Sequence, residues 1–253
     1  MGIVGTFRCW RWRATATCDA ATRARWRLGF DAVLRRHCPL PRLGVVVGLA
    51  AEARIARPFG WRVAIGGGTA SGALTAAQGL IDAGSDALVS FGLAGGLDPA
   101  LRPGALIVPC AVIVDEVRFH TDPGLSRMLG GVTPHTVAGA DAIAVRVEDK
   151  HRLHCRTSAA AVDLESGSVA RVATAHGMPF AVLRAICDPA ERSLPAVALA
   201  ALDARGVIGV WRVITSLTAW PGQLPALLAL AVDAAAARRS LVERVRQITP
   251  TWV

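Results

Sequence analysis

The sequence predicts a single α/β domain with a largely parallel sheet, and three observations support this expectation. From Leu43 onward, short runs of branched apolar residues alternate with longer helix-like segments. Several of these runs are apolar throughout, which is typical of parallel strands that are buried on both faces. The chain has 253 residues, 53% of them hydrophobic, and no internal repeat, which suits one domain with one core.

The first half of the domain is expected to begin with a strand that Gly48 ends, followed by a short helix that carries Glu52. A glycine turn then separates a second strand from a helix. A third strand follows at a spacing that implies a right-handed crossover. The predicted elements are strand Val45–Val47, strand Val63–Ile65, helix Ser71–Ala83 and strand Ala87–Phe91.

The second half is expected to begin with two further strand candidates, "GALIVP" and "AVIVDEVRFH". The segment from Thr121 to Lys150 is predicted to be irregular. Pro225 stands near the first turn of the last predicted helix and Pro250 just beyond its end, where proline is favoured. The remaining predicted elements are strand Ala160–Val162, a helix after Glu165, strand Phe180–Ile186 and a helix from about Pro225 to Ile248.

The positive charge of the chain is concentrated at its N-terminus. Residues 1–42 hold nine arginines against Asp19 and Asp31, a balance of +7, while the whole chain carries +9. We therefore interpret residues 1–42 as a solvated basic extension, disordered or preceding the true start, and residues 43–253 as the domain. A basic arm that binds phosphates is the alternative. No nucleic-acid-binding face of the domain is predicted.

The cysteines and histidines show no spacing typical of a metal site or a disulfide framework. The six cysteines are scattered without a CxxC pair. His151 and His154 lie three residues apart in an Arg- and Lys-rich stretch that we expect to be exposed. We therefore predict no metal, no disulfide framework and a reducing cytoplasm as the location.

One stretch, Val213–Val232, is 20 residues long and uncharged, which is the length of a membrane-spanning helix. It contains Trp220-Pro221-Gly222, and Pro-Gly is a turn signal. We expect the end of one helix and the start of the next here. A true span is one alternative, and contact of this apolar stretch with a membrane surface is another.

The segment "GGGTASG" follows a predicted strand and opens a predicted helix, which is the context of a dinucleotide-binding loop. Ser71, however, stands where the third glycine of that motif belongs. The acid expected after the next strand is missing, since Asp86 precedes that strand. We interpret the segment as a tight turn with close packing, and a Rossmann cofactor site is the alternative.

Two acids flank the apolar segment "AVDLESGSVARVATAHGMPFAVLRAICDPAE". Glu165 shares a helical face with Val169 and Val172, so it should point toward the core and need a partner. That partner is either a ligand or a protein group such as Arg184. Asp188 begins an Asp-Pro-Ala-Glu stretch that resembles a helix-capping box, so a structural role is the alternative to a chemical one.

The segments "VVVGLAAEARIA", "SFGLAGGLDPALRPGALIVP" and "AVDLESGSVARVATAHGMPFAVLRAICD" resemble the superfamily of purine nucleoside phosphorylases and methylthioadenosine/S-adenosylhomocysteine nucleosidases. The resemblance runs from about Leu43 to Ile248, and its wording is most similar to the hopanoid-associated phosphorylase branch. It implies a three-layer fold with a central mixed, largely parallel sheet flanked by helices. It also implies cleavage of an N-ribosidic bond.

The resemblance assigns roles to both acids. Glu165 matches the acid that binds the ribose hydroxyls, and Leu164 the residue beneath the sugar. Asp188 matches the general acid that protonates the leaving purine. Ala94 and Gly95 match the backbone along the base and ribose.

Further positions match in part. Arg184 matches a residue that supports the general acid. The segment departs from the family pattern at Leu164, where Met is common, at Gly167, where Ala is common, and at Cys187, where Ser is usual.

The nucleophile is left open between water and phosphate. In the nucleosidases a carboxylate of the first loop orients the attacking water, and Glu52 is the candidate, one place before the aligned position. Phosphate would instead be held by amides near Gly48 and by an arginine, Arg54 or Arg118.

We therefore expect a cytoplasmic enzyme that releases adenine from an adenine nucleoside with a bulky apolar 5′ group, as in adenosylhopane. The alternatives are a methylthioadenosine/S-adenosylhomocysteine nucleosidase, a general purine nucleoside phosphorylase, and a non-catalytic nucleoside- or lipid-binding protein. No cofactor is expected, and inorganic phosphate is expected only as a co-substrate. A homo-oligomer is expected.

Overall fold

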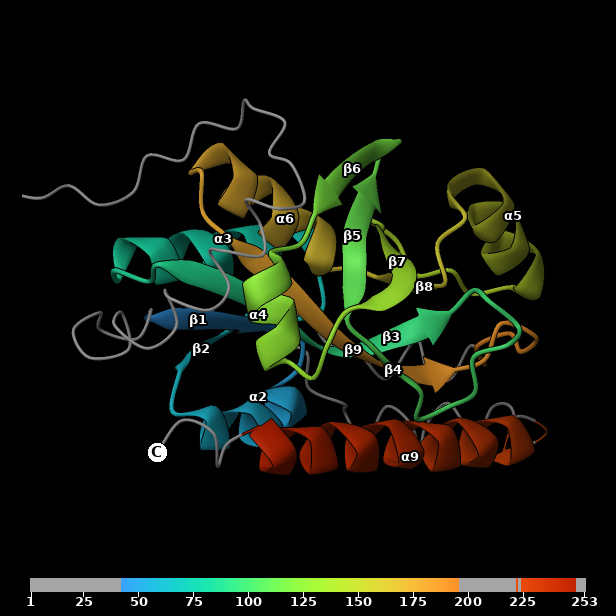
Figure 1. Ribbon diagram of the computed structural model, residues 1–253. Coiled ribbons are helices and arrows are strands. Elements are labelled where there is room, and N and C mark those ends of the chain that lie inside the picture. Colours follow the sequence, from blue (N-terminus) through green and yellow to red (C-terminus); the bar gives the residue numbers. More distant parts are fainter. Residues whose placement is uncertain (1–41, 196–221, 223, 249–253) are drawn as a thin grey trace, which may run out of the picture. The chain divides into compact units, whose positions relative to one another are not determined.

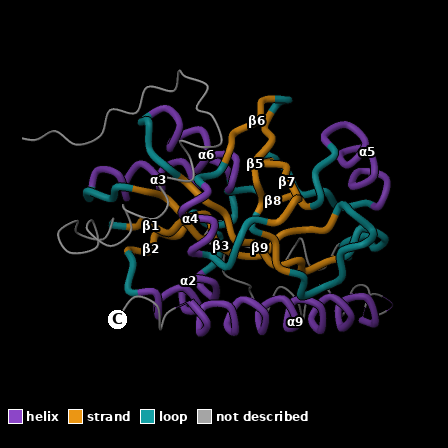
Figure 2. The backbone as a smooth tube through the Cα atoms, viewed as in Figure 1, coloured by secondary structure: helices purple, strands orange, loops and turns teal. Residues whose placement is uncertain are grey.

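The computed structural model describes residues 42–195, 222 and 224–248, which belong to the unit Pro41–Val253 (Figures 1 and 2). The strands of the described part are β1 Leu43–Val47, β2 Arg62–Ile65, β3 Ala87–Gly96, β4 Leu106–Ile107, β5 Pro109–Val114, β6 Val117–His120, β7 Thr133–Gly139, β8 Ala161–Asp163 and β9 Phe180–Asp188. Its helices are α2 Ala50–Ala56, the 3-10 turn η2 Arg57–Phe59, α3 Ala70–Asp82, α4 Pro123–Met128, α5 Val147–Thr157, α6 Ser166–Ala175 and α9 Leu224–Ile248.

The nine described strands form one mixed sheet, as expected. The order β2-β1-β3-β8-β7-β5-β6 makes the main path, and β9 pairs with both β3 and β4. Five pairs are parallel, namely β1 with β2, β1 with β3, β3 with β9, β5 with β7 and β7 with β8. The pairs β3–β8, β4–β9 and β5–β6 are antiparallel.

Helices cover both faces of this sheet, which explains why its central strands are apolar throughout (Figure 1). Val46 and Leu88 point to the face covered by α3 and α6. Val45, Val47 and Phe91 point to the opposite face, where α2, α4 and α9 pack. Successive residues of one strand alternate between the faces, so a strand buried on both faces needs apolar residues at every position.

Helix α9 confirms the predicted C-terminal helix and begins one residue earlier than expected. Its buried residues are Ala237, Leu241, Val245 and Ile248, which follow a spacing of three or four. That spacing places them on one stripe of the helix, and the stripe packs against the core beside β9, β3 and β4. Tertiary packing of this stripe stabilises the helix.

The glycine segment before α3 forms a tight turn with close packing. Thr69 is the N-cap of α3, and its hydroxyl accepts a hydrogen bond from the Gly72 amide at 3.1 Å. A Cβ on Gly66 would lie 2.8 Å from the amide nitrogen of Ala73, and a Cβ on Gly72 would overlap the Gly66 carbonyl. Both glycines are therefore explained by the contact between the turn and the helix.

Two expectations about the middle of the chain were wrong. The segment "AVIVDEVRFH" is a hairpin of β5 and β6, turned by Asp115 and Glu116 at φ values of 48° and 67°. Non-glycine residues rarely adopt positive φ, so the sequence of this segment gave no sign of a turn at Asp115 and Glu116. The segment predicted to be irregular contains α4, β7 and the start of α5. Asp122 caps α4 by accepting from the Leu125 amide.

The start of the described part bears on the predicted boundary at Leu43. The Arg42 amide donates to the Asp86 carboxylate at 3.1 Å, and the Asp86 amide donates to the Arg42 carbonyl at 2.8 Å. Arg42 therefore already belongs to the folded domain, one residue before the predicted boundary. The rest of the extension, residues 1–41, lies outside the described residues.

Half of the apolar stretch Val213–Val232 also lies outside the described residues, including Trp220 and Pro221. Among the helices that are described, none combines the length and apolarity that crossing a bilayer requires.

Candidate active site

The carboxyl ends of the parallel strands β1, β3 and β9 bring several acids and one arginine to one edge of the sheet. The loop after β1 carries Gly48 and leads to Glu52 in α2. The register of β3 on β9 places Gly92 opposite Arg184 and Gly95 opposite Asp188. Ligand sites of α/β proteins commonly form at this edge, because the loops that follow the strands meet there.

Arg184 lies at the centre of this cluster and is fully buried. Its Nε is 2.7 Å from Oδ2 of Asp163, and its Nη2 is 3.1 Å from Oε2 of Glu165. Nη2 also donates to the Ser90 hydroxyl at 2.7 Å, and Nη1 donates to the Leu93 carbonyl at 3.3 Å. A buried guanidinium with its donors used in this way is held in a single orientation.

Asp163, the last residue of β8, was not among the predicted site residues. Its Oδ1 accepts from the amides of Glu165 at 3.0 Å and Ser166 at 2.7 Å, so it fixes the turn that starts α6. The sequence did carry a signal for this, because an aspartate three residues before the first residue of a helix commonly bonds the following amides. By pairing with Arg184 as well, Asp163 links β8 to β9.

Glu52 is buried although it lies on a short surface helix. Its Oε2 accepts from the Leu49 amide and its Oε1 from the Leu93 amide, both at 2.8 Å. Burial raises the pKa of Glu52, while Arg184 and these amides act in the opposite direction. A Cβ on Gly92 would lie 2.5 Å from Oε1 of Glu52, so glycine at position 92 leaves room for this carboxyl group.

Glu165 is buried, as its position on an apolar helical face predicted. Its partner in the structure is Arg184, which was one of the two predicted kinds of partner. Burial, together with the neighbouring Asp163 and Glu52 carboxyl groups, raises the pKa of Glu165 to about 7 against the opposing effect of Arg184. These three carboxyl groups surround one guanidinium, so full ionisation would leave a net negative charge in the core. Because its pKa is raised to about 7, Glu165 is partly protonated near neutral pH, which reduces that negative charge.

Asp188, the last residue of β9, is also buried, and it does not cap a helix. Residues 189–195 form a turn and irregular backbone, so the capping alternative was wrong. The Asp188 carboxylate instead forms an ion pair with Lys150, and its Oδ1 accepts from the Cys187 thiol at 3.2 Å. Burial raises the pKa of the Cys187 thiol, and the adjacent Asp188 carboxylate raises it further.

Lys150 was expected in an exposed stretch and is instead almost fully buried, with 1% of its surface exposed. Its ammonium group contacts Asp188 and donates to the carbonyls of Pro189 at 2.8 Å and Arg192 at 2.9 Å. The neighbouring His151 is exposed, as predicted. The sequence gives no sign that Lys150 is buried, because it stands between Asp149 and His151 in a helix that is rich in charged residues.

The other predicted site residues divide into two groups. Ala94 and Gly95 lie in β3, and a Cβ on Gly95 would be 3.3 Å from Oδ1 of Asp188. Leu164 is half-buried between Asp163 and Glu165. The phosphate candidates Arg54 and Arg118 are exposed, on α2 and β6, and neither is among the contacts described above for the buried acids.

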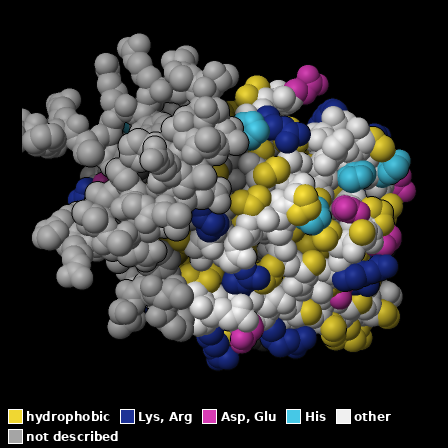
Figure 3. Space-filling model, in the orientation of Figure 1, with side chains coloured by type: hydrophobic (Ala, Val, Ile, Leu, Met, Phe, Trp, Pro, Cys, Tyr) yellow, Lys and Arg dark blue, Asp and Glu magenta, His cyan; other side chains and the backbone are white. Residues whose placement is uncertain are grey.

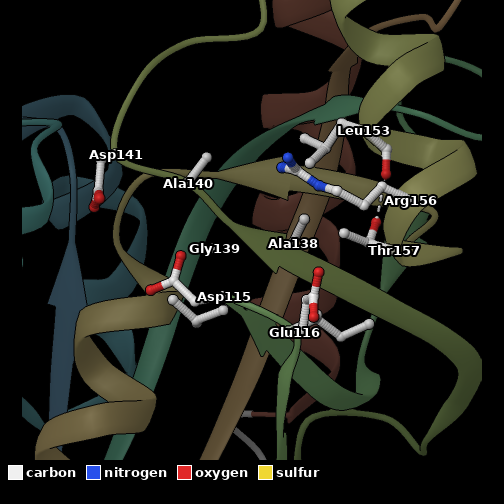
Figure 4. Close-up of a pocket in the computed structure, with 11 residues that line it drawn as sticks. Asp115, Glu116, Ala138, Gly139, Ala140, Asp141, Leu153, Arg156 and Thr157 are labelled. Atoms are coloured by element: carbon white, nitrogen blue, oxygen red, sulfur yellow. Dashed lines mark hydrogen bonds between the residues drawn. The ribbon is translucent and has the colours of Figure 1, made fainter.

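A cavity of about 390 Å³ opens between the β5–β6 turn, the end of β7 and α5 (Figure 4). Its walls carry the acids Asp115, Glu116 and Asp141 and the arginine Arg156. None of the predicted site residues lines it. The backbone links the carboxyl cluster to the rim of this cavity, where the Ala140 amide donates to the Asp163 carbonyl at 2.9 Å. In the described part of the chain, no group of three or more potential ligands is arranged to hold a metal ion.

Comparison with known families gives one match, which covers more than half of the chain. A family model described as the phosphorylase superfamily matches residues 60–205. A search of curated protein sequences found no match.

Solved structures share the fold at low sequence identity. The Helicobacter pylori 5′-methylthioadenosine/S-adenosylhomocysteine nucleosidase superposes with a TM-score of 0.58 at 17% identity, covering 83% of this chain and 100% of that one. The futalosine hydrolase of the same organism gives 0.57 at 16%, covering 82% and 98%. A putative methylthioadenosine nucleosidase from Weissella paramesenteroides gives 0.57 at 19%, covering 84% and 100%.

Proposed function

The chain belongs to the phosphorylase superfamily, and from this membership we propose that it hydrolyses the N-ribosidic bond of an adenine nucleoside and releases adenine. One observation carries the proposal. The edge of the sheet holds two separate buried acid groups, the Glu52–Glu165 pair near Gly48 and Asp188 at the end of β9. Cleavage of this bond develops positive charge on the sugar and negative charge on the base, so it needs a carboxylate beside the sugar and a proton donor beside the base.

In the proposed reaction the bond between C1′ and the purine nitrogen breaks, and its electron pair moves onto the base. Asp188, protonated when the substrate binds, donates its proton to N7 of the leaving purine and becomes the carboxylate that pairs with Lys150. The oxygen of a water molecule bonds to C1′, and Glu52 accepts the proton that this water loses. Glu165 binds the ribose hydroxyls, while Arg184 holds Glu165 in place through the pair at 3.1 Å.

The charge of the cluster supports water over phosphate as the nucleophile. Arg184 is the cation beside Glu52 and Glu165, and its donors already bind Asp163, Glu165, Ser90 and Leu93. Among the described residues, a phosphate dianion would meet two carboxyl groups there and no cation beside Arg184, and contacts between like charges are unfavourable. Water meets no such repulsion, and a carboxylate can orient it by accepting its proton.

We propose further that the substrate carries a bulky apolar 5′ group of the adenosylhopane type. The support is the resemblance of the sequence to the hopanoid-associated branch and the apolar composition of residues 206–232. Most of that segment lies outside the described residues. Its described end adds Leu228 and Val232, which are 57% and 66% exposed at the start of α9. Figure 3 shows hydrophobic side chains gathered in that region of the surface.

Two solved relatives suggest the alternatives for the 5′ group. Their names give methylthioadenosine and S-adenosylhomocysteine for one enzyme and futalosine for the other. A methylthioadenosine/S-adenosylhomocysteine nucleosidase is therefore the second candidate function. For the first candidate function, with the bulky apolar 5′ group, we also propose a cytoplasmic location, assembly into a homo-oligomer and contact with a membrane surface.

The deciding experiment measures adenine release from a panel of adenosines with 5′ substituents of increasing apolar size, each with and without inorganic phosphate. We expect release without phosphate, no ribose 1-phosphate, and kcat/KM that rises with apolar size. If methylthioadenosine is the preferred substrate and long apolar 5′ groups are rejected, the protein is a methylthioadenosine/S-adenosylhomocysteine nucleosidase and the hopanoid-type substrate is wrong. Binding without release of adenine across the panel would indicate a non-catalytic nucleoside- or lipid-binding protein.

A further inference from the structure

Lys150 stands out among the buried groups because no step of the proposed reaction uses it. It is the only lysine of the chain, and it lies within α5, which otherwise carries its charged residues toward solvent. Its ammonium group has three acceptors, namely Asp188 Oδ2 and the carbonyls of Pro189 and Arg192. An ammonium ion has three N–H donors and no acceptor, so this site matches the charged form of lysine.

The two carboxylate oxygens of Asp188 have different partners. Oδ2 is bound to Lys150, whereas Oδ1 accepts only from the Cys187 thiol among the contacts described. Both carboxylate oxygens face Gly95, the backbone position that pairs with Asp188 across the strands, since a Cβ there would lie 3.3 Å from Oδ1 and 3.4 Å from Oδ2. Because Lys150 binds Oδ2, the oxygen left for a ligand is Oδ1.

We propose that Lys150 is a positioning residue for the proton transfer by Asp188: it fixes Oδ2 so that Oδ1 faces the base, and it compensates the negative charge that Asp188 gains on giving up its proton. This inference rests on the proposed function, in which Asp188 is the general acid. Lys150 keeps its own proton throughout. It acts through Asp188 and touches neither the sugar nor the base.

The alternative is that Lys150 only fastens α5 to the segment after β9. The charge argues against this, because a buried ion pair loses much of its Coulombic gain to the desolvation of both ions. Apolar side chains of similar volume would join the two segments at least as stably. A charged pair at this position is better explained if the charge has a task in the reaction.

The titratable groups that face Asp188 in the described structure set the expected pH dependence. They are Lys150 from α5 and the Cys187 thiol from β9, and Glu52 from α2 acts on the same thiol. A nearby cation favours the ionised carboxylate. Removal of Lys150 should therefore move the alkaline decline of kcat/KM, which reports loss of the transferred proton, toward higher pH.

The experiment compares Lys150→Met, Lys150→Arg, Asp188→Asn and the double variant Lys150→Met/Asp188→Asn, with adenine release from adenosine as the readout. Arg152→Met, two residues along the same helix and exposed, is the matched control. We expect Lys150→Met to lower kcat by about 100-fold, at the lower end of a general-acid contribution. Lys150→Arg should recover part of the loss, and Arg152→Met should leave kcat unchanged.

The double variant separates a role through Asp188 from a purely structural one. If Lys150 acts through Asp188, the double variant loses no more activity than Asp188→Asn alone, because the two residues act as a unit. A further tenfold loss in the double variant, or an unshifted alkaline decline in Lys150→Met, would overturn the inference. Should Lys150→Met fail to fold, Lys150→Gln replaces it, since its amide still donates to the carbonyls without a charge.

The outcome also distinguishes this inference from the proposed function. Turnover retained by Asp188→Asn would contradict the role of Asp188 as the general acid. An inactive Asp188→Asn together with a fully active Lys150→Met would leave the proposed function intact and remove only the role of Lys150.

Discussion

Gly48 in the loop after β1 and Glu165 at the start of α6 lie so close together that a Cβ at position 48 would overlap Oε1 of the Glu165 carboxyl group. The same Cβ would stand 3.4 Å from Oε2 of Glu52. Glycine at this position therefore lets two carboxyl groups from distant elements approach one backbone. The contact ties the first loop of the domain to the proposed sugar-binding acid.

Gly48→Ala is expected to displace the Glu165 carboxyl group and to lower kcat/KM for adenine release by at least about tenfold, since small misplacements of positioning groups are costly. The fold should survive, as judged by circular dichroism. Gly79→Ala is the matched control, because a Cβ there meets nothing within 4 Å in the middle of α3. That control should keep its activity and gain up to about 1 kcal/mol of stability. If Gly48→Ala keeps normal activity, the position of the Glu165 carboxyl group does not matter for the reaction.

Asp188→Asn is expected to abolish turnover of adenine nucleosides while binding survives, because an amide can accept a hydrogen bond but cannot supply the proton. The expected loss in kcat is ~100- to 10,000-fold. Single-turnover adenine release gives the rate, and isothermal titration with adenosine gives the affinity. If the variant turns over normally and is only less stable, Asp188 has a structural role alone.

Glu165→Gln is expected to change how the free energy of unfolding depends on pH. The pKa of Glu165 is raised from 4.5 to about 7 in the folded protein. A carboxyl group with a raised folded pKa contributes stability that is fully present below pH 4.5 and lost as the pH rises through about 7. One pKa unit corresponds to about 1.4 kcal/mol, so the wild type should lose ~3 kcal/mol more than the variant over this range.

Urea denaturation at several pH values between 4.5 and 8 measures this difference. Parallel curves for the two proteins would mean that Glu165 titrates normally in the fold. Glu148→Gln, in α5 and away from the cluster, is the control and should follow the wild type.

Deletion of residues 1–41 is expected to leave the melting temperature and adenine release nearly unchanged, because the composition of the chain changes at the start of β1. Arg42 should be kept, since its backbone and side chain bind Asp86. A variant that lacks residues 1–42 tests that contact and should melt slightly lower. A fall of several degrees on removal of residues 1–41 would show that the extension packs on the domain.

The sequence predicted those parts of the fold in which local pattern and burial agree. The apolar runs of β1 and β9 and the stripe of α9 are examples, because one face or both faces of each are covered. The burial of Glu165 followed in the same way from the apolar residues on its helical face. Asp163 was missed although it had a local signal, the spacing of an aspartate before a helix start.

Lys150 could not be predicted, because its partners are a carboxylate and two carbonyls that lie about forty residues away in sequence. Its neighbours on the same helix are solvated charges, and their pattern predicts exposure. The turn at Asp115 and Glu116 was missed for a different reason. Its positive φ values occur at residues that carry no glycine signal, so only the pairing of β5 with β6 reveals it.

The burial of Arg184 also has a consequence for the order in which the protein folds. A guanidinium cannot enter a core unless its partners arrive with it, and these partners lie on β3, β8 and α6. Ser90 alone is 94 residues away along the chain. We therefore expect the central strands to dock in one concerted and late event, since contacts between distant segments are slow to form.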